Sequence, residues 1–287
     1  MQQSLPRAPL VLSCDVVRDV DGLIDLREVD MRVAVGLYGL LGGVSGKDGA
    51  GDVISPAVAG EHVMRNVVDV NSADVFAHTW TVGHDDEIRS VFRPVSLISE
   101  RPPAFDAKQA WKSLPLSSRF GEWRDARFSP RTVGSTKRSL VRAMSRWEST
   151  RRCLQLVTEH EVATGQRYDA VLITRFDVAF YTPFDFGSLR RSVTYLSHWN
   201  NYPIEGVRPL DYANLGVGKA CLDFWVYLPR EHLEDFRKHL GDFTHFSISP
   251  HRALYEYLVA SGCSIDYTKY RWVDHEMVRR KEFGTSL

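Results

Sequence analysis

The sequence lacks most of the features that are typical of zinc-stabilised, secreted or membrane proteins. Its 287 residues include only four cysteines, which are far apart and form no C-x-x-C pair: Cys14, Cys153, Cys221 and Cys263. This spacing argues against a zinc site and a disulfide framework, and we expect reduced thiols in the core. No apolar run approaches the roughly 20 residues of a membrane span. The apolar part of the opening "MQQSLPRAPLVLSC" is too short for a signal peptide. We therefore expect no transmembrane segment and a cytoplasmic location.

A surplus of charge of either sign is also missing. Lys and Arg together number 36, and Asp and Glu together number 36. No overall field favours nucleic acid or an anionic membrane, so any phosphate chemistry must be local. Hydrophobic residues make up 44% of the chain, which is enough to bury a sizeable core. These properties predict a soluble globular protein without a nucleic-acid partner.

Several common site motifs are absent as well. "GGVSGKDG" fails the Walker pattern, because Leu41 stands where the first glycine would be and Asp48 where Ser or Thr would follow the lysine. "GVGKAC" has only the first two glycines of a dinucleotide fingerprint. No G-x-S-x-G or H-E-x-x-H motif occurs. "HTWTVGHDDE" contains residue types that ligate zinc, which we interpret as incidental at this spacing: His78, His84, Asp85 and Asp86.

The chain is predicted to have an N-terminal extension and one domain. In residues 1–30, Asp21-Gly22 separates two β-branched runs, which is typical of a β-hairpin. Residues 31–287 are expected to form a single domain. There, "RVAVGLYG" (Arg32–Gly39) predicts a buried strand that opens into a glycine-rich loop.

Strands and helices alternate along most of that domain. Further strands are expected in "ADVFAHTW", at Val91–Glu100, from Tyr168, and in "SVTYLS", "CLDFWVYL" and "SIDYTKYRW". Helices are expected from Pro56, from Ser135 to about Thr164, and in "REHLEDFRKHL" and "SPHRALYEYLVASG". In the helix from Pro56, Val63, Val67 and Val70 should form the apolar side. The pattern predicts an α/β fold with a mostly parallel central sheet flanked by helices.

The stretch "YDAVLITRFDVAFYTPFDF" (Tyr168–Phe186) carries an apolar strand into Arg175 and Asp177. In an open α/β sheet, ligands bind beyond the carboxyl ends of the strands. A carboxylate there can hold a divalent cation such as Mn²⁺ or Mg²⁺, and a guanidinium can pair with a diphosphate. The alternative is that Asp177 only caps the turn and Arg175 is its solvated partner.

Two later segments contain further candidate site residues. Asp223 lies in the otherwise apolar "CLDFWVYL", where a buried carboxylate is costly unless it serves a site or a firm hydrogen bond. Trp199 and Asn200, in "LSHWNNYP", have the side chains to stack on a sugar and to hydrogen-bond to it. A packed turn explains that second segment equally well.

Five blocks of the chain together resemble the GT-A-like glycosyltransferases that build surface glycans in bacteria and large algal viruses. The resemblance runs from about Met31 to Trp272, through "MRVAVGLYGLLGG", "ADVFAHTW", "SRWESTRRCLQLVTEHEVATGQRYDAVLITRFDVAFY", "CLDFWVYLPREHLEDF" and "SPHRALYEYLVASG". It implies a GT-A-like, Rossmann-like fold and an Arg-x-Asp or Asp-x-Asp element that binds a metal and the donor diphosphate.

The resemblance also implies roles for individual residues. Tyr38 and Gly39 would lie beside the nucleotide, and Asp177 would face the metal. Ser145, Arg146 and Arg152 fall on a helix segment that faces the sugar nucleotide in that family; the alternative for each arginine is a solvated helix face. Asp223 matches a position that contacts the acceptor and acts as a base. The chain departs from many relatives in having one carboxylate, in Arg175-Phe176-Asp177, where they have two, which weakens metal ligation.

The sequence thus predicts a metal-binding glycosyltransferase that moves a hexosyl or deoxyhexosyl group from a nucleotide-diphosphate donor to a glycan acceptor hydroxyl. The alternative is a catalytically inactive nucleotide- or carbohydrate-binding protein with the same fold, which the single carboxylate favours. A sugar nucleotidyltransferase would need a glycine- and lysine-rich triphosphate loop, for which Lys47 alone is thin support.

Overall fold

The computed structural model describes residues 31–42, 52–106, 108, 111–112, 116, 119, 132–197, 224–240, 254, 257–266 and 274–278. All of them belong to one compact unit, Met31–Leu287. The hairpin predicted in residues 1–30 lies outside the described residues. No helix among those described is both long enough and apolar enough to cross a membrane.

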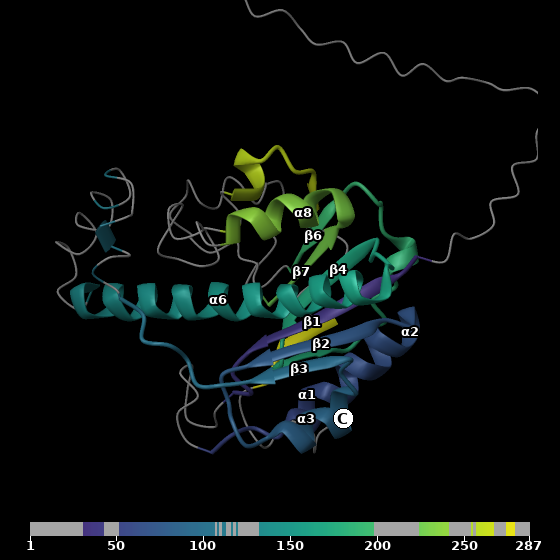
Figure 1. Ribbon diagram of the computed structural model, residues 1–287, viewed down its shortest axis with the longest axis horizontal. Coiled ribbons are helices and arrows are strands. Elements are labelled where there is room, and N and C mark those ends of the chain that lie inside the picture. The colour runs from purple at the N-terminus through teal and green to yellow at the C-terminus, as the bar shows by residue number, and fades with distance from the viewer. Residues whose placement is uncertain are drawn as a thin grey trace, which may run out of the picture. The chain divides into compact units, whose positions relative to one another are not determined.

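A seven-stranded sheet forms the centre of the molecule (Figure 1). Its strands, in spatial order, are β3 (Ser96–Ser99), β2 (Asp74–Thr79), β1 (Val33–Gly39), β4 (Ala170–Arg175), β7 (Trp225–Pro229), β6 (Thr194–Leu196) and β8 (Ile265–Asp266). β7 runs antiparallel to both its neighbours, and every other pair is parallel. β5 (Val178–Phe180) and β9 (His275–Met277) form a separate antiparallel pair. The predicted fold class, α/β with a mostly parallel sheet, is confirmed.

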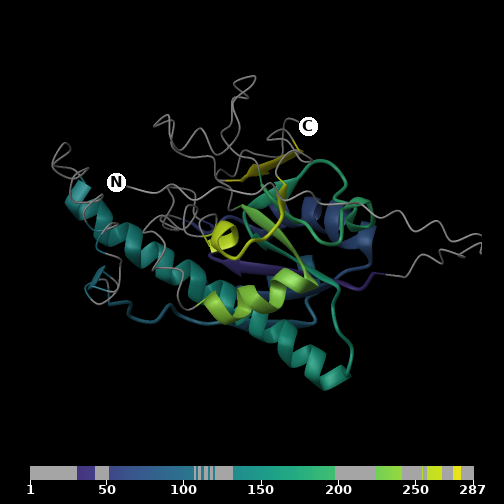
Figure 2. The ribbon, with the colours of Figure 1, turned by 90° about the horizontal axis from the view of Figure 1, so that it is seen from above.

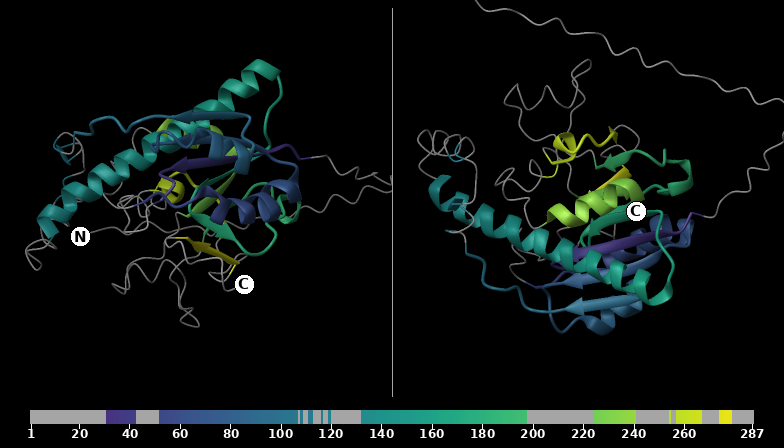
Figure 3. Two further views of the ribbon diagram at one scale, coloured as in Figure 1. Left: turned by 90° about the horizontal axis from the view of Figure 1, so that it is seen from below. Right: turned by 45° about the horizontal axis from the view of Figure 1, so that its top comes forward.

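Helices cover both faces of this sheet. One face packs against α1 (Pro56–Val63), the π-helix η1 (Met64–Val68) and α3 (Asp85–Phe92), and the short α2 (Asp69–Asn71) continues from η1. The other face packs against α6 (Thr132–Thr164) and α8 (Arg230–His239), which lie next to each other in Figures 2 and 3. A short 3-10 helix spans Phe186–Ser188. Because both faces are covered, β1 and β4 are buried along almost their whole length, which explains their continuous apolar runs.

A buried carboxylate fastens α6 to α8. Glu161 of α6 accepts a hydrogen bond from the backbone N–H of Tyr168 at 2.9 Å and pairs with Arg230 and Arg237 of α8. Burial alone would raise the pKa of Glu161, but that N–H and the two guanidinium groups lower it overall. The pair of helices is therefore held at the end of α6 where the chain turns into β4.

The strand predicted at Val91–Glu100 is wrong in its first half. Helix α3 continues to Phe92, and β3 begins only at Ser96. Three acidic residues in the first turn favour the positive end of the helix dipole, and Ile88 and Phe92, four residues apart, are both fully buried. These local helix signals outweigh the β-branched residues that suggested a strand.

The apolar side predicted for the helix that begins at Pro56 is wrong at one position. Pro56 opens this helix, as expected, and Ser55 caps it; Val63 and Val67 are fully buried. Val70, however, is 46% exposed. The π-helical turn over Met64–Val68 adds a residue to one turn, so the face that follows is rotated away from the core.

Candidate functional site

The carboxyl ends of four parallel strands meet at one edge of the sheet. Gly39 pairs with Thr79, Thr79 with Ser99, and Tyr38 with Arg175. The last residues of β1, β2, β3 and β4 therefore lie side by side. We call this line of strand ends the carboxyl edge.

Arg175 and Asp177 form a two-pronged ion pair at the carboxyl edge. The Nε and Nη2 atoms of Arg175 donate to the two carboxylate oxygens of Asp177 at 2.7 and 2.6 Å. The Arg175 side chain is 30% exposed, whereas that of Asp177 is 3% exposed. Burial lowers the pKa of Arg175, but the charge and hydrogen bonds of Asp177 raise it overall. The cation is thus the solvent-facing member of the pair, and it stays charged.

Tyr38 brings a second arginine to the same place. Its register with Arg175 puts both side chains on the face of the sheet that α6 covers. The guanidinium carbon of Arg146, on α6, lies 5.7 Å from the centre of the Tyr38 ring and 4.4 Å from the Trp147 ring. Two of the predicted donor-binding arginines therefore lie around one tyrosine.

The loop after β1 depends on two glycines. Gly39 and Gly42 both have φ of +101°, a conformation that side chains other than glycine rarely adopt. A Cβ atom on Gly42 would lie 3.6 Å from the Cβ of Asp177, so the loop passes directly beside the ion pair. The described part of this loop ends at Gly42 and resumes at Asp52.

A buried polar chain joins this loop to α6. The Gly39 N–H donates to Ser149 Oγ at 2.8 Å, and this oxygen lies 2.7 Å from His78 Nδ1. His78 Nε2 lies 3.0 Å from a carboxylate oxygen of Glu100. Burial lowers the pKa of His78, and the Glu100 hydrogen bond offsets part of that effect. A neutral histidine that accepts from Ser149 and donates to Glu100 satisfies the whole chain.

This chain places a serine, a histidine and a glutamate within hydrogen-bonding distance, as in serine hydrolases. Ser149 and His78 are both completely buried, however, and the serine oxygen already accepts from Gly39. A substrate carbonyl has no access to such a hydroxyl. The arrangement therefore holds α6 against the strands. The sequence analysis did not predict it, and the signal available was a histidine inside the apolar "ADVFAHTW".

The remaining predicted residues of α6 have fixed partners. Arg152 pairs with Glu100 at 2.5 Å and with Glu148 at 2.9 Å. The backbone carbonyl of Ser145 accepts a hydrogen bond from Trp80 Nε1 at 3.1 Å. Arg152 is thus neutralised by two carboxylates, and Ser145 fixes Trp80 against the helix. Their roles in donor binding stay predictions.

The described residues do not fit a bound divalent cation. Mn²⁺ and Mg²⁺ need several oxygen ligands with free lone pairs. The carboxylate of Asp177 is buried, and both its oxygens accept from Arg175. In the described part of the chain, no group of three or more His, Cys, Asp or Glu residues is arranged to hold a metal ion. No step of the chemistry proposed below is therefore assigned to a metal.

Three predicted acceptor residues lie outside the described residues: Trp199, Asn200 and Asp223. The described strands next to them reach the carboxyl edge, because β6 ends there at Leu196 and β7 begins there at Trp225, opposite Thr174. The four residues set aside as zinc ligands do not come together. His78 bonds to Ser149 and Glu100, whereas His84 pairs with Glu87 at 3.3 Å.

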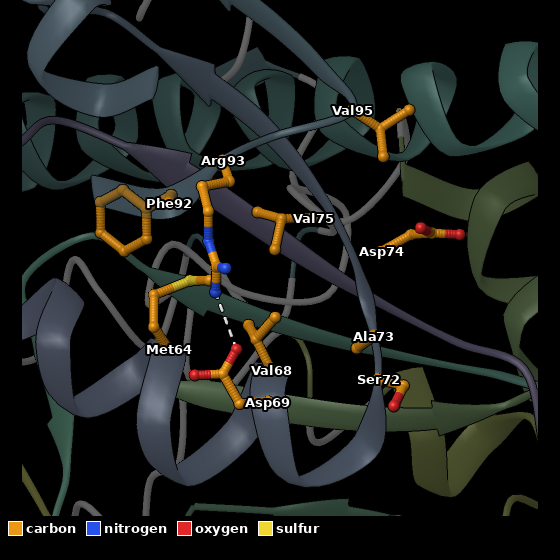
Figure 4. A pocket seen from close by; sticks show the side chains of 10 residues that line it. All are labelled: Met64, Val68, Asp69, Ser72, Ala73, Asp74, Val75, Phe92, Arg93 and Val95. Atoms are coloured by element: carbon orange, nitrogen blue, oxygen red, sulfur yellow. Dashed lines mark hydrogen bonds and ion pairs between the residues drawn. The ribbon is translucent and has the colours of Figure 1, made fainter. Parts of the chain in front are cut away.

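A cavity of about 360 Å³ opens at the other edge of the sheet, where β2 and β3 begin (Figure 4). Apolar and polar side chains line it, and Arg93 and Asp69 reach toward each other across it at 2.7 Å. Both partners of this ion pair are more than half exposed. The cavity does not include any of the predicted site residues; its lining is Met64, Val68, Asp69, Ser72, Ala73, Asp74, Val75, Phe92, Arg93 and Val95.

The sequence matches no protein-family model and no curated protein. Distantly similar solved structures include the following two. One is a nucleoside-diphosphate-sugar pyrophosphorylase from Vibrio cholerae RC9, at 10% identity and a TM-score of 0.40 over 86% of this chain and 96% of that one. The other is a glycosyltransferase involved in glycosylation of the major capsid of PBCV-1, at 10% identity and a TM-score of 0.35 over 82% of this chain and 81% of that one. Scores this low assign no family, so the proposal below depends on the site.

Proposed function

We propose that this protein is a glycosyltransferase that moves a sugar from a nucleoside-diphosphate donor to the hydroxyl of a glycan acceptor. One observation carries the proposal. At the carboxyl edge of an open α/β sheet, Arg175 is held in a fixed orientation by Asp177 beside Tyr38, with Arg146 over the same tyrosine. Fixed, partly exposed arginines are suited to a diphosphate, and a tyrosine face is suited to a base or sugar ring.

The chemistry requires two kinds of assistance. The acceptor oxygen bonds to the anomeric carbon as the bond from that carbon to the phosphate oxygen breaks, and the diphosphate leaves with the electron pair. Arg175 and Arg146 are in a position to stabilise the charge that develops on this leaving group. The proton of the acceptor hydroxyl passes to a base, for which we propose the carboxylate of Asp223.

The acceptor would bind next to the donor. Trp199 and Asn200 are our proposed sugar-contacting residues, because they follow β6, which ends at the carboxyl edge. An aromatic face beside an amide suits a pyranose ring and its hydroxyls. The partners of the protein are then a nucleotide sugar and a glycan.

A thermal-shift panel of nucleotide sugars tests the proposal. A ligand that binds only the folded state raises the melting temperature according to its concentration relative to its dissociation constant. We expect at least one UDP-, GDP-, ADP- or dTDP-sugar to raise the melting temperature of the wild type, and the same sugar to lose its effect on the Arg175→Lys variant. The proposal fails if no member of the panel shifts the wild-type protein, either without Mn²⁺ or with Mn²⁺ in excess over the ligand.

A second candidate is a nucleotide- or carbohydrate-binding protein that uses the same site but does not catalyse sugar transfer. The engaged state of Asp177 favours it, because the one carboxylate of the motif is already paired. A donor-hydrolysis assay distinguishes the two. Saturable nucleotide binding without release of sugar, across a panel of glycan acceptors, would identify the binding protein.

A further inference from the structure

The ion pair between Arg175 and Asp177 leads to an inference about how a donor diphosphate is neutralised. We infer that Arg175 takes the place of a divalent cation: its guanidinium, oriented by Asp177, supplies the positive charge at the diphosphate, so donor binding does not depend on a metal ion. This inference rests on the function proposed above. It differs from the sequence prediction, in which Asp177 faces a metal.

The first argument is the difference in exposure within the pair. About a third of the Arg175 side chain is exposed, but only 3% of the Asp177 side chain is. A ligand that approaches from solvent therefore meets the cation before the carboxylate. A site of this polarity suits an anion, whereas a metal site would present its carboxylate oxygens.

The second argument is the number of hydrogen-bond donors left over. A guanidinium has five N–H groups. In the described part of the chain Asp177 engages two of them, one on Nε and one on Nη2. Three N–H groups thus remain for another acceptor, and phosphate oxygens match their planar arrangement.

The third argument is the rigidity of both residues. Arg175 ends β4, where it pairs with Tyr38, and the backbone carbonyl of Asp177 accepts from the Val278 N–H at 2.7 Å. Val178, the next residue, begins β5, which is paired with β9. With Arg175 in β4 and the backbone of Asp177 bonded to Val278, the guanidinium is oriented before a ligand arrives. A metal ion would have to break this pair to reach Asp177.

The test compares nucleotide binding with and without metal. UDP, GDP, ADP and dTDP serve as probes in calorimetric titrations, in EDTA and in MnCl₂. For the wild type, we expect the dissociation constant of the best probe to agree within about twofold between the two conditions, since the charge comes from the protein. Manganese alone, followed by its electron paramagnetic resonance signal, should not bind at a stoichiometric site.

Arg175→Ala removes the cation and exposes the carboxylate. In EDTA we expect nucleotide binding to weaken about tenfold or more, in line with the loss of a charge-assisted two-pronged contact. Mn²⁺ should restore part of the affinity, because Asp177 is then free to bind it. The double variant Arg175→Ala, Asp177→Asn should lose this recovery. Circular dichroism checks that each variant is folded, and Arg175→Gln replaces Arg175→Ala if the latter is not.

Arg190→Ala is the matched control. Arg190 also pairs with an aspartate, Asp266 at 3.2 Å, but its side chain is 70% exposed and lies near the start of β6, at the edge opposite to the site. The nucleotide affinity of the Arg190→Ala variant should equal that of the wild type, both in EDTA and in MnCl₂.

The outcomes separate the inference from the function. Wild-type binding only in Mn²⁺ would overturn the inference and leave the transferase proposal standing. Absence of nucleotide binding in both conditions would overturn both. Unchanged affinity of Arg175→Ala in EDTA would also overturn the inference, whereas loss in EDTA with partial recovery in Mn²⁺ supports it.

Discussion

The burial and pairing of Asp177 determine how a substitution there affects the protein. A carboxylate exposed in a loop could become an amide with little effect on folding. Here it is 4% exposed and holds Arg175 with both oxygens, so an amide would turn one N–H donor toward another donor. Its replacement therefore affects stability as well as chemistry.

We predict that Asp177→Asn lowers both the free energy of unfolding and the rate of transfer. A loss of about 1–3 kcal/mol in stability is expected, below the figure for a fully buried pair because Arg175 is partly exposed. Transfer should fall about 100-fold or more, because Arg175 loses its orientation at the leaving group. Urea denaturation and initial rates at saturating donor measure the two effects. Wild-type turnover in this variant would contradict the assignment of the pair to the site.

Gly39 offers a test of the loop after β1. Its φ of +101° makes alanine unfavourable there, although nothing lies within 4 Å of where the new Cβ would be. We predict that Gly39→Ala costs about 1–2 kcal/mol of stability through backbone strain alone, and that it weakens nucleotide binding as well. Gly165→Ala is the control: Gly165 also has positive φ, +69°, and open space, but it follows α6 at the opposite edge. Equal effects of the two variants on binding would argue against a role for the loop.

Among the elements, α6 connects the most parts of the site. It contacts β1 through Ser149, β2 through His78, and the tyrosine of the site through Arg146. At its other end Glu161 fastens it to α8. A single long helix thus sets the position of the arginines relative to the strand ends.

We predict that Ser149→Ala destabilises the protein by about 1–3 kcal/mol, because the buried His78 nitrogen and the Gly39 N–H both lose a partner. The Michaelis constant for the donor should rise, since the loop after Gly39 is no longer tied to α6. Thr158→Ala on the same helix is the control, because its hydroxyl donates to the carbonyl of Leu154, one turn earlier within α6. A Michaelis constant that stays at the wild-type value would show that the contact is structural only.

Most elements could be predicted from the sequence because their patterns are local. Strong apolar runs predicted β1 and β4, and Pro56 marked the start of α1. The phase of the helix after Met64 could not be predicted, since a π-helical turn leaves no periodicity to recognise. β5 and β9 were also missed, because three-residue strands depend on their pairing across the chain.

The site was predictable only where residues follow a strand. Arg175 and Asp177 could be placed at the carboxyl edge because β4 ends there. Their pairing with each other was one of two alternatives, between which the sequence could not decide. The chain through Ser149, His78 and Glu100 joins three elements, and its register depends on how α6 packs on the sheet. Such contacts depend on tertiary packing, which cannot be inferred from local sequence patterns.

At the scale of the whole molecule, stability should depend on pH through buried histidine. His78 faces Ser149 and Glu100, with Arg152 and Glu148 nearby, and burial holds its pKa below the value of about 6.5 for an unfolded chain. The unfolded state therefore binds the proton more readily than the folded state. The contribution of neutral His78 to the free energy of unfolding is complete above that value and is lost as the pH falls below it.

We predict that the urea midpoint of the wild type is constant from about pH 8 to 7 and falls between about pH 7 and 5. His62 and His232 also have pKa values lowered by burial, so they contribute to the same slope. The His78→Gln variant should be less stable throughout but show a flatter slope. Midpoints measured at half-unit pH intervals give the difference. An identical slope in the variant would contradict a neutral, buried His78.

The arrangement of the sheet also determines where the chain can change in length. After β1, β3 and β6 the chain leaves the described sheet at the carboxyl edge, and it returns to β7 at that same edge. At the opposite edge the connections are short: β7 passes directly into α8, and only a few residues separate α6 from β4. Insertions and deletions after β1, β3 or β6 would therefore leave every strand in register, whereas those at the opposite edge would not. Changes of length in the loops at the carboxyl edge can thus alter ligand recognition during evolution without disturbing the central sheet.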